Sequence, residues 1–366
     1  MQLVAMGAQD VYLTGNPQIT FFKVVYRRHT NFSKECIAQQ FNGTADFDSS
    51  VTCTLARNGD LVQEIYLRVA MQCDVTTGQT WSVADMTNLI KTVEVEIGGQ
   101  KIDKHYSQWL DIYNELFETS HDYRTVMNTA SIVVDKTDHT FYVPLRFWFN
   151  RNPGLALPLI ALQYHEVKIN MTLAAAASVK FAASDNGSCT PTISSADLLV
   201  NYLYLDTDER RRFAQVSHEY LIEQVQHTGV ESEKTIDMTF NHPVKALFWT
   251  GAWTNVKLQL NGHDRAAVQA HDYYHLVQPY ESGLGHSGES LTAGTRAWAT
   301  VASGGDVGMY SFCLKPAEHQ PSGTCNFSRI DNARLDVGSG GDLWLFAMNY
   351  NVLRIMSGMG GLAYSN

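Results

Sequence analysis

The segment HDYYH has the spacing of a zinc-binding helix. His271 and His275 are four residues apart, so both side chains would lie on one face of a helix, as in the H-E-x-x-H zinc motif. Asp272 stands where that motif has its glutamate, and no third ligand is evident. The chain holds 13 histidines, so a pair at this spacing is also expected by chance. We therefore predict no metal site.

Other sequence patterns that would support catalysis are absent. The chain has no G-x-S-x-G nucleophile motif, no P-loop and no cupin-like cluster of two histidines and a glutamate. The glycine-rich runs at 338–341 and 358–361 lack the strand-to-helix context of a phosphate-binding loop, and we interpret them as turns. These observations predict a protein that is not an enzyme and needs no cofactor.

An aromatic and basic segment, GNPQITFFKVVYRRHTNF, lies near the N-terminus at residues 15–32. It lacks the features of a secretion signal, because Pro17 interrupts it and the charges follow the apolar run. Its aromatic side chains need a cover, and its cationic side chains need acidic partners or solvent. The residues that we single out as candidates for contacts with a partner are Phe21, Phe22, Lys23, Arg27 and Arg28.

The overall composition favours a globular protein that assembles. Apolar residues make up 45% of the 366 residues and charged residues only 17%, below the usual quarter. A surface with few charges is often covered by a partner, although Ser, Thr, Asn and Gln on a monomer would give the same composition. The net charge of −10 argues against direct binding to nucleic acid. No apolar run has the length of a membrane-spanning helix.

The six cysteines show no pattern of metal or disulfide sites. None forms a C-x-x-C pair, and their spacings match no zinc motif. Most lie in apolar or alternating segments, where a free thiol packs as a small apolar side chain. The sequence therefore predicts a reducing compartment and no disulfides.

An internal repeat divides the chain into two similar units. VEVEIGGQKID begins at Val93 and VKLQLNGHDRA begins at Val256, an offset of 256 − 93 = 163 residues. In each copy an alternating strand meets a turn that ends at Gly99 or Gly262, and a segment rich in aromatic residues follows. Two copies of one domain explain this pattern.

The repeat continues downstream but loses its register. Pro158 and Pro321 have the same offset, 321 − 158 = 163. After them, the apolar positions Ala333, Leu335 and Val337 lie one residue out of phase with the first copy. A bulge or a slip in the second copy would account for the change of phase.

Each unit is predicted to consist mostly of strands. Residues 61–71 alternate between apolar and polar side chains, and Asn58-Gly59 just before them is a hairpin signal. Regular helices do not separate the strands, although helical spacing of apolar residues follows Tyr106. We predict an all-β fold of two tandem eight-stranded antiparallel jelly rolls with short helices in the loops.

We expect four parts along the chain. The segment DTDERRRFAQ would form a short helix over 208–215, capped by Asp206 or Thr207, and would join the two units through salt bridges. The predicted parts are an N-terminal arm at 1–24, a first jelly roll at 25–205, a joint at 206–216 and a second jelly roll at 217–366.

Five stretches of the sequence, in order, resemble those of one protein family. They are GNPQITFFKVVYRRHTNF, NPGLALPLIALQYHEVKI, DTDERRRFAQVSHEYLIEQ, EHQPSGTCNFSRID and the terminal NYNVLRIMSGMGGLAYSN. The chain resembles the double jelly-roll major capsid proteins of nucleocytoplasmic large DNA viruses. The resemblance covers nearly the whole chain. This chain is shorter than many members, so prominent outer loops are not expected.

The resemblance implies a structural role. Members form homotrimers whose six jelly rolls make a pseudo-hexagonal capsomer of an icosahedral shell. It further implies contacts with neighbouring capsomers and with minor capsid and penton proteins, assembly in the host cell cytoplasm, and an arm on the inner side of the shell. There the basic residues would face acidic neighbours or the internal viral membrane, unless Arg27 and Arg28 pair within the subunit. The alternatives are a minor capsid or penton-type paralogue, and a double jelly-roll carbohydrate-active enzyme or lectin.

Overall fold

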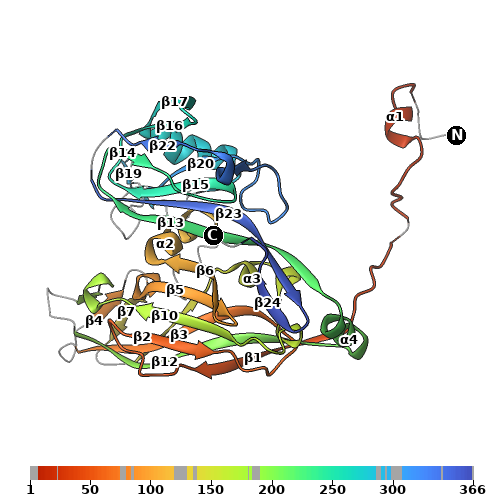
Figure 1. Ribbon diagram of the computed structural model, residues 1–366, viewed down its shortest axis with the longest axis horizontal. Coiled ribbons are helices and arrows are strands. Elements are labelled where there is room, and N and C mark those ends of the chain that lie inside the picture. The colour runs from red at the N-terminus through yellow and green to blue at the C-terminus, as the bar shows by residue number, and fades with distance from the viewer. Residues whose placement is uncertain are drawn as a thin grey trace.

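The computed structural model shows two β-sandwiches joined by a short helix, with an extended N-terminal segment (Figure 1). It describes residues 7–22, 24–74, 80–83, 86–118, 130–134, 138–179, 181–183, 190–285, 290–292, 295–297, 307–338 and 341–364. No helix in these ranges is long and apolar enough to cross a membrane.

The first sandwich contains one five-stranded and one four-stranded sheet. One has the order β1-β12-β3-β8 and the other has the order β2-β10-β5-β6. The strands of the first sheet are β1 (Phe32–Gln40), β12 (Thr190–Leu205), β3 (Leu61–Asp74) and β8 (His139–Pro144), with the short β9 (Leu157–Pro158) also paired to β3. Those of the second are β2 (Ser50–Thr54), β10 (Val167–Leu173), β5 (Ile90–Ile97) and β6 (Gln100–Tyr106). A smaller sheet holds β11 (Phe181–Ala183), β4 (Thr80–Val83) and β7 (Ala130–Val134).

The second sandwich repeats the same strand order. Its sheets are β13-β23-β15-β20 and β14-β22-β16-β17. The first comprises β13 (His218–Glu231), β23 (Leu343–Met356), β15 (Pro243–Gly251) and β20 (Val307–Ser311), with β21 (Cys325–Asn326) on β15 and β24 (Met359–Leu362) on β23. The second comprises β14 (Thr235–Asp237), β22 (Ala333–Asp336), β16 (Asn255–Leu260) and β17 (His263–Ala270), and a separate hairpin holds β18 (Ser290–Thr292) and β19 (Thr295–Ala297). In both units the first and last long strands are neighbours, as in a jelly roll. The predicted all-β fold of two tandem jelly rolls is therefore confirmed, whereas the count of eight strands in each roll stays a prediction.

Short helices occupy the connections. The α-helices are α1 (Val11–Thr14), α2 (Ser107–Leu116), α3 (Trp148–Arg151), α4 (Thr207–Gln215) and α5 (Gln278–Glu281). The remaining turns of helix are η1 (Met86–Leu89), η3 (Pro153–Leu155), η4 (Leu159–Ala161), η5 (Ala176–Ser178), the π-helix η7 (Tyr273–Val277) and η8 (Phe327–Arg329). The helical spacing seen after Tyr106 thus corresponds to α2.

The alternation of side chains along the strands builds each core. In β3, Ile65, Leu67, Val69 and Met71 are buried, and the residues between them are half-buried. Burying one such side chain contributes about 1.5–3 kcal/mol. The core of the first roll also includes Ile222, Leu353 and Ile355 from strands of the second roll. The two rolls therefore share apolar contacts.

The internal repeat is confirmed at its central hairpin. Ile97 pairs with Gln100 in the first roll, and Leu260 pairs with His263 in the second. The two turn residues have positive φ in each case, at Gly98–Gly99 and Asn261–Gly262. Such a turn matches the twist of the flanking strands and favours glycine and asparagine.

The predicted correspondence between Pro158 and Pro321 is wrong. Leu157 and Pro158 form β9, which pairs with β3, and the equivalent strand on β15 is β21, which begins at Cys325. The offset there is 325 − 157 = 168. Extra residues before β21 lengthen the second unit, and this explains why the apolar phase shifts after it.

Asn58-Gly59 does not form the predicted hairpin. These residues connect β2 to β3, and the two strands lie in different sheets. The glycine is needed instead for close packing, because a Cβ at Gly59 would lie 2.8 Å from the Cβ of Tyr202. Tyr202 is itself buried and donates a hydrogen bond to the carbonyl oxygen of Ala56 at 2.7 Å.

Replacing Gly59 with alanine is expected to lower the free energy of unfolding by about 1–3 kcal/mol, because the new methyl group must displace Tyr202. Gly285→Ala is the matched control, since a Cβ at Gly285 would have no other atom within 4 Å and the φ of this residue is not positive. The control should stay within about 1 kcal/mol of the wild type. Chemical denaturation measures both values, and equal effects of the two substitutions would contradict the packing argument.

The helix between the two rolls agrees with the prediction. The side chain of Asp206 accepts a hydrogen bond from the backbone of Thr207 at 2.8 Å and so caps α4. Arg210 on this helix forms an ion pair with Asp60 of the first roll, with 3.0 Å between Nε and Oδ1. The segment therefore makes the predicted kind of salt bridge.

The prediction of a chain without disulfides is wrong. Cys73 is disulfide-bonded, whereas Cys36, Cys53, Cys313 and Cys325 are free. Pairing depends on how close two Cα atoms lie in the fold, and the spacing of cysteines along the chain does not report that distance.

In denaturant without a reductant, four thiols are expected to react with a thiol reagent, matching the four free cysteines. After reduction all six cysteines of the chain should react. Cell lysis in the presence of an alkylating agent controls for disulfides formed during purification. Six reactive thiols before reduction would contradict the disulfide at Cys73.

Candidate functional site

The boundary between the two jelly rolls, which we call the seam, combines an aromatic cluster with buried polar residues. Helix α2 of the first roll lies against the second roll (Figure 1). The ring of Trp109 lies 5.4 Å from that of Phe248 and 5.8 Å from that of Phe346. This aromatic cluster forms the apolar part of the seam.

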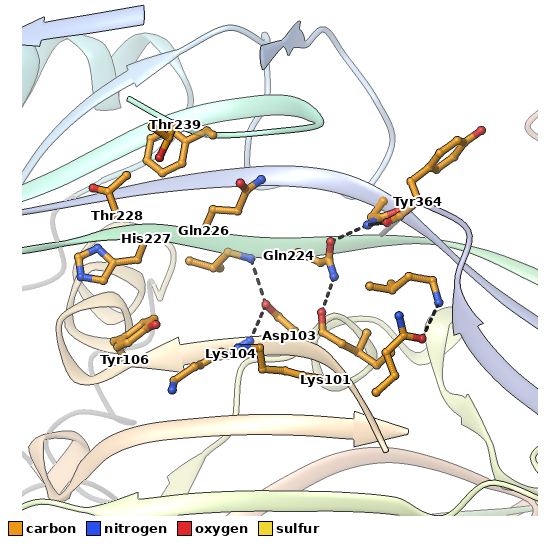
Figure 2. A pocket seen from close by; sticks show the side chains of 16 residues that line it. Lys101, Asp103, Lys104, Tyr106, Gln224, Gln226, His227, Thr228, Thr239 and Tyr364 are labelled. Carbon is orange, nitrogen blue, oxygen red and sulfur yellow. Dashed lines mark hydrogen bonds between the residues drawn. The ribbon is translucent and has the colours of Figure 1, made fainter. Parts of the chain in front are cut away.

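Strand β6 of the first roll and strand β13 of the second roll form the polar part of the seam (Figure 2). The side chain of Gln224 donates a hydrogen bond to the carbonyl oxygen of Ile102. The backbone N–H of Val225 donates to Oδ1 of Asp103 at 3.1 Å. Side chains on each strand therefore satisfy backbone groups of the other, and the two strands are held in one register.

A cavity of about 410 Å³ adjoins these hydrogen bonds. Its lining includes Lys101, Lys104 and Tyr106 from β6, and Gln226 and His227 from β13 (Figure 2). A second cavity, of about 390 Å³, is lined by Arg151, Glu223 and His319, among others. The seam is thus hollow at two places beside its polar contacts.

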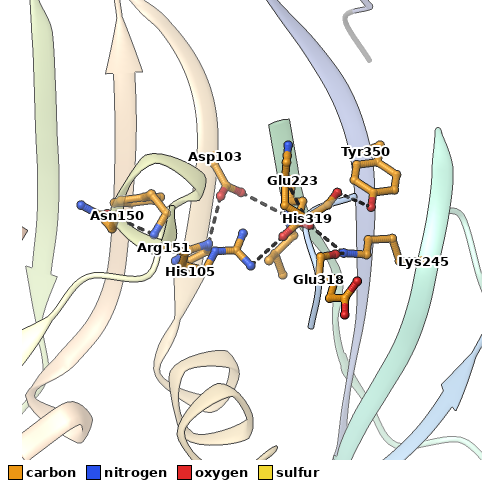
Figure 3. Close-up of polar contacts among 11 residues, drawn as sticks. Asp103, His105, Asn150, Arg151, Glu223, Lys245, Glu318, His319 and Tyr350 are labelled. Carbon is orange, nitrogen blue, oxygen red and sulfur yellow. Dashed lines mark hydrogen bonds and ion pairs between the residues drawn. The ribbon is translucent and has the colours of Figure 1, made fainter. Parts of the chain in front are cut away.

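Glu223 lies at the centre of a buried ion cluster beside the second cavity (Figure 3). Its carboxylate contacts Nη1 of Arg151 at 2.7 Å and Nζ of Lys245 at 2.6 Å. Arg151 ends helix α3 in the first roll, whereas Glu223 and Lys245 belong to β13 and β15 of the second roll. We call these three residues the seam cluster.

Two further groups complete the surroundings of Lys245. Its ammonium group donates a hydrogen bond to the carbonyl oxygen of Glu318 at 2.9 Å and lies 5.0 Å from the centre of the Tyr350 ring. The hydroxyl of Tyr350 donates to the carbonyl oxygen of His319 at 2.9 Å. Lys245 is only 1% exposed, so these contacts replace the water that it would otherwise bind.

The charges of the seam cluster stabilise one another. Burial alone would raise the pKa of Glu223, but Arg151, His319 and Lys245 outweigh it and hold this pKa at about 2. Burial lowers the pKa of Lys245, and Glu223 opposes that shift. Burial would also lower the pKa of Arg151, but Glu223 and weaker neighbours raise it above its ordinary value. Glu223 and Arg151 are therefore ionised at neutral pH.

The C-terminal hairpin of the second roll also contacts the first roll. His165 Nδ1 lies 3.1 Å from the backbone nitrogen of Gly360 and accepts its hydrogen bond. A Cβ at Gly360 would lie 2.6 Å from Leu162, so only glycine allows this close approach. Of the run at 358–361, only Gly358, which has positive φ, lies in the turn between β23 and β24, whereas residues 359–361 belong to β24.

The N-terminal segment extends away from the rest of the chain (Figure 1). Phe21 is 99% and Phe22 is 98% exposed. Tyr26 is also exposed, and the first long strand begins only at Phe32. Large exposed aromatic groups in a row mark a site of interaction.

The cationic candidates of this segment have no partner within the described part of the subunit. Arg27 and Arg28 are exposed and form no ion pair among the described residues. Lys23 lies outside the described residues.

The histidines of the HDYYH segment lie near each other but in different surroundings. The ring centres of His271 and His275 are 5.3 Å apart. His275 is buried with its Nδ1 2.7 Å from the carbonyl oxygen of Val307, and His271 stacks on Trp253. No group of three potential metal-ligating side chains occurs in the ranges that the structure describes.

The seam cluster was not predicted from the sequence. A signal was present at Lys245, which interrupts the otherwise apolar strand PVKALFWTG. An ionisable residue in such a strand must find a buried partner. The partners themselves could not be named, because Arg151 comes from a short helix and Glu223 from another strand, both distant in the sequence.

Comparisons with known proteins agree with this architecture. A family model described as the N-terminus of major capsid proteins matches residues 20–206. A second model, for major capsid proteins of large eukaryotic DNA viruses, matches residues 209–253 and 250–361. The junction between the two matches falls at the start of α4.

Relatives and solved structures cover almost the whole chain. The major capsid protein of Pyramimonas orientalis virus is 52% identical and that of Paramecium bursaria Chlorella virus 1 is 42% identical, each over 100% of this chain and 99% of the relative. A chain of the PBCV-1 virus capsid superposes with a TM-score of 0.77 and 37% identity, over 95% of this chain and 100% of that one. The Faustovirus major capsid protein, at 12% identity over 96% of this chain and 94% of that one, shares the fold with a TM-score of 0.70. The chain belongs to the family of major capsid proteins of large eukaryotic DNA viruses.

Proposed function

We propose that this protein is a structural subunit of an icosahedral virus shell, with no enzymatic role. Its full-length similarity to viral major capsid proteins, over 100% of the chain at 52% identity, is the observation that supports this function most strongly. The two jelly rolls with the same strand order supply the repeated unit that such a shell requires.

The assembly mechanism follows from the doubling of the fold. Three copies of a chain with two similar rolls place six similar units around one axis. The resulting homotrimer has true three-fold symmetry but a nearly hexagonal outline, so it can tile a flat lattice beside identical neighbours. Minor capsid and penton proteins would occupy the remaining positions in the virion, and assembly would take place in the host cell cytoplasm.

The purified protein is expected to form a trimer of the 40.9-kDa chain. Its interface should belong to the large obligate class, because the capsomer must survive free in solution. Light scattering measures the mass, and electron microscopy shows whether the trimers form hexagonal lattices. A monomer that stays stable at micromolar concentration would contradict the trimer.

The N-terminal arm is proposed to lie on the inner side of the shell. Its exposed aromatic groups, including Phe21 and Phe22, would be covered there by the trimer or by the layer beneath it. Lys23, Arg27 and Arg28 supply positive charge, which would attract acidic proteins or the anionic lipid of an internal membrane. We do not expect the arm to bind nucleic acid, because the chain carries a net charge of −10.

A further inference from the structure

We propose that the seam cluster, Arg151, Glu223 and Lys245, sets the angle between the two jelly rolls and thereby positions them for capsomer assembly. The cluster is a positioning element, and this inference rests on the proposed function as a shell subunit.

The cluster joins the two rolls directly. Arg151 is the last residue of α3 in the first roll, and its guanidinium group contacts Glu223 of the second roll at 2.7 Å. Lys245 contacts the other oxygen of the same carboxylate at 2.6 Å. Both oxygens of Glu223 are therefore engaged at once, one from each side of the seam (Figure 3).

The apolar contacts of the seam do not by themselves fix the angle between the two jelly rolls. Cavities of about 410 and 390 Å³ adjoin the contact between β6 and β13 and the seam cluster. Aromatic groups such as Trp109 and Phe248 can remain in contact through small rotations, since apolar contact has no strong directional requirement. Directional contacts must therefore define the orientation of the rolls.

A buried ion cluster is a directional contact, because rotating one roll relative to the other would separate its charges at a cost in free energy. If Arg151 moved away from Glu223, the carboxylate would keep only its contact with Lys245, and the half-buried guanidinium group would lose its ion pair across the seam. Separating two largely buried opposite charges in this way is unfavourable. Replacing a whole buried ion cluster by apolar residues is, by contrast, often neutral for stability. The seam cluster therefore contributes to a single orientation more than to total stability.

The orientation matters for the shell. In a trimer that imitates six-fold symmetry, the rotation between the two rolls of one chain must match the rotation between chains. A chain with a variable angle would still form two folded rolls, but its capsomers would not tile a regular lattice. A change in the cluster is therefore expected to affect lattice assembly and the distribution of distances between the two rolls.

The test uses three variants of the full-length chain. Arg151→Met removes the contact between the rolls and leaves Glu223 and Lys245 as a neutral pair. A triple variant, R151M/E223L/K245M, removes all the charges of the cluster together. The control, E219Q/R354Q, neutralises an exposed ion pair between β13, which also carries Glu223, and β23, with 2.8 Å between its atoms.

Spin labels report the distance between the rolls. One label is attached to the native Cys36, which is exposed on β1 of the first roll. The second is attached to Ser232→Cys, an exposed position after β13 of the second roll, and Cys325→Ser removes the half-buried thiol. Labelled chains are diluted with an excess of unlabelled chain, so that distances within one chain dominate. Lattice formation is scored on the unlabelled variants by electron microscopy.

The wild type and the control are expected to show one narrow distance distribution and regular lattices. Arg151→Met and the triple variant should remain folded, show a broadened or shifted distribution, and lose regular lattices. Arg151→Lys, which keeps the charge, should restore part of both properties.

The inference would be overturned if the Arg151→Met and triple variants gave the same narrow distance distribution as the wild type and also formed normal lattices. Unfolding of both variants would also overturn it, since the cluster would then be required for the fold itself. Failure of the wild type to form trimers or lattices would instead contradict the proposed function, and the distance measurement would still report on the seam.

Discussion

Replacing Glu223 with glutamine is expected to lower the free energy of unfolding by about 3–5 kcal/mol, the usual result of breaking a buried ion pair on one side. The substitution leaves the charges of Arg151 and Lys245 close together with no carboxylate between them. Lys245 is 1% exposed, so water cannot replace the lost partner without opening the seam.

Urea denaturation followed by fluorescence measures this change. Glu219→Gln is the matched control, because Glu219 lies on β13 like Glu223 but forms an exposed pair with Arg354. An exposed pair of this kind contributes at most about 1 kcal/mol. A loss as small for Glu223→Gln as for the control would show that the seam cluster is not buried in solution.

The same residue makes stability depend on pH. The pKa of Glu223 falls from an ordinary value of 4.5 to about 2 in the folded chain. A lowered pKa means that the ionised form stabilises the fold, so its contribution is complete above pH 4.5 and is lost as the pH falls towards 2. The contribution corresponds to about 3 kcal/mol. Glu223→Gln should remove this part of the acid sensitivity, which denaturation curves at a series of pH values would reveal.

Deleting residues 1–24 is expected to abolish lattice formation or attachment to the inner layer while leaving the fold intact. The described residues of this segment are exposed except for the half-exposed Asp10, and their hydrogen bonds are local, such as the one between Gly7 and Asp10. The strands begin only at Phe32, so neither core loses a contact with the described residues of the segment. Circular dichroism should be nearly unchanged, and electron microscopy of assembly mixtures should show the defect.

Changing Lys23, Arg27 and Arg28 together to glutamine should give a milder defect than the deletion. If charge pairing with the inner layer is responsible, raising the salt concentration should weaken assembly of the wild type in the same way. A truncated chain that fails to fold would show that the arm belongs to the first core. A truncated chain that assembles normally would show that the arm has no role in the shell.

Local features of the fold could be read from the sequence. The alternation along β3 predicted its buried face, because successive side chains of a strand point to opposite sides. Asn261-Gly262 and Gly98-Gly99 predicted tight hairpins, because those residues tolerate positive φ. Asp206 predicted the start of α4, because its side chain can satisfy the free N–H groups of a helix end. Each of these properties depends on neighbours within a few residues.

Predictions from the sequence were wrong where a residue's role depends on a distant segment. Asn58-Gly59 has the composition of a hairpin turn, but Gly59 is needed for the approach of Tyr202. Cys73 lies in an alternating strand like the free Cys53, yet it is disulfide-bonded. The residues next to Gly59 do not distinguish a packing glycine from a turn glycine, and those next to Cys73 do not distinguish a disulfide-bonded cysteine from a free one.

Repeats, alternation and turn residues are properties of short stretches, so the amino-acid sequence alone predicts a doubled β-unit with an aromatic, basic arm. How the two units meet depends on the folded structure. Arg151, Glu223 and Lys245 are remote from one another along the chain, and each alone would be costly to bury. They become a stable cluster only when the completed rolls bring the three charges within hydrogen-bonding distance, because electrostatic pairing depends on separation in space and not on order in the chain.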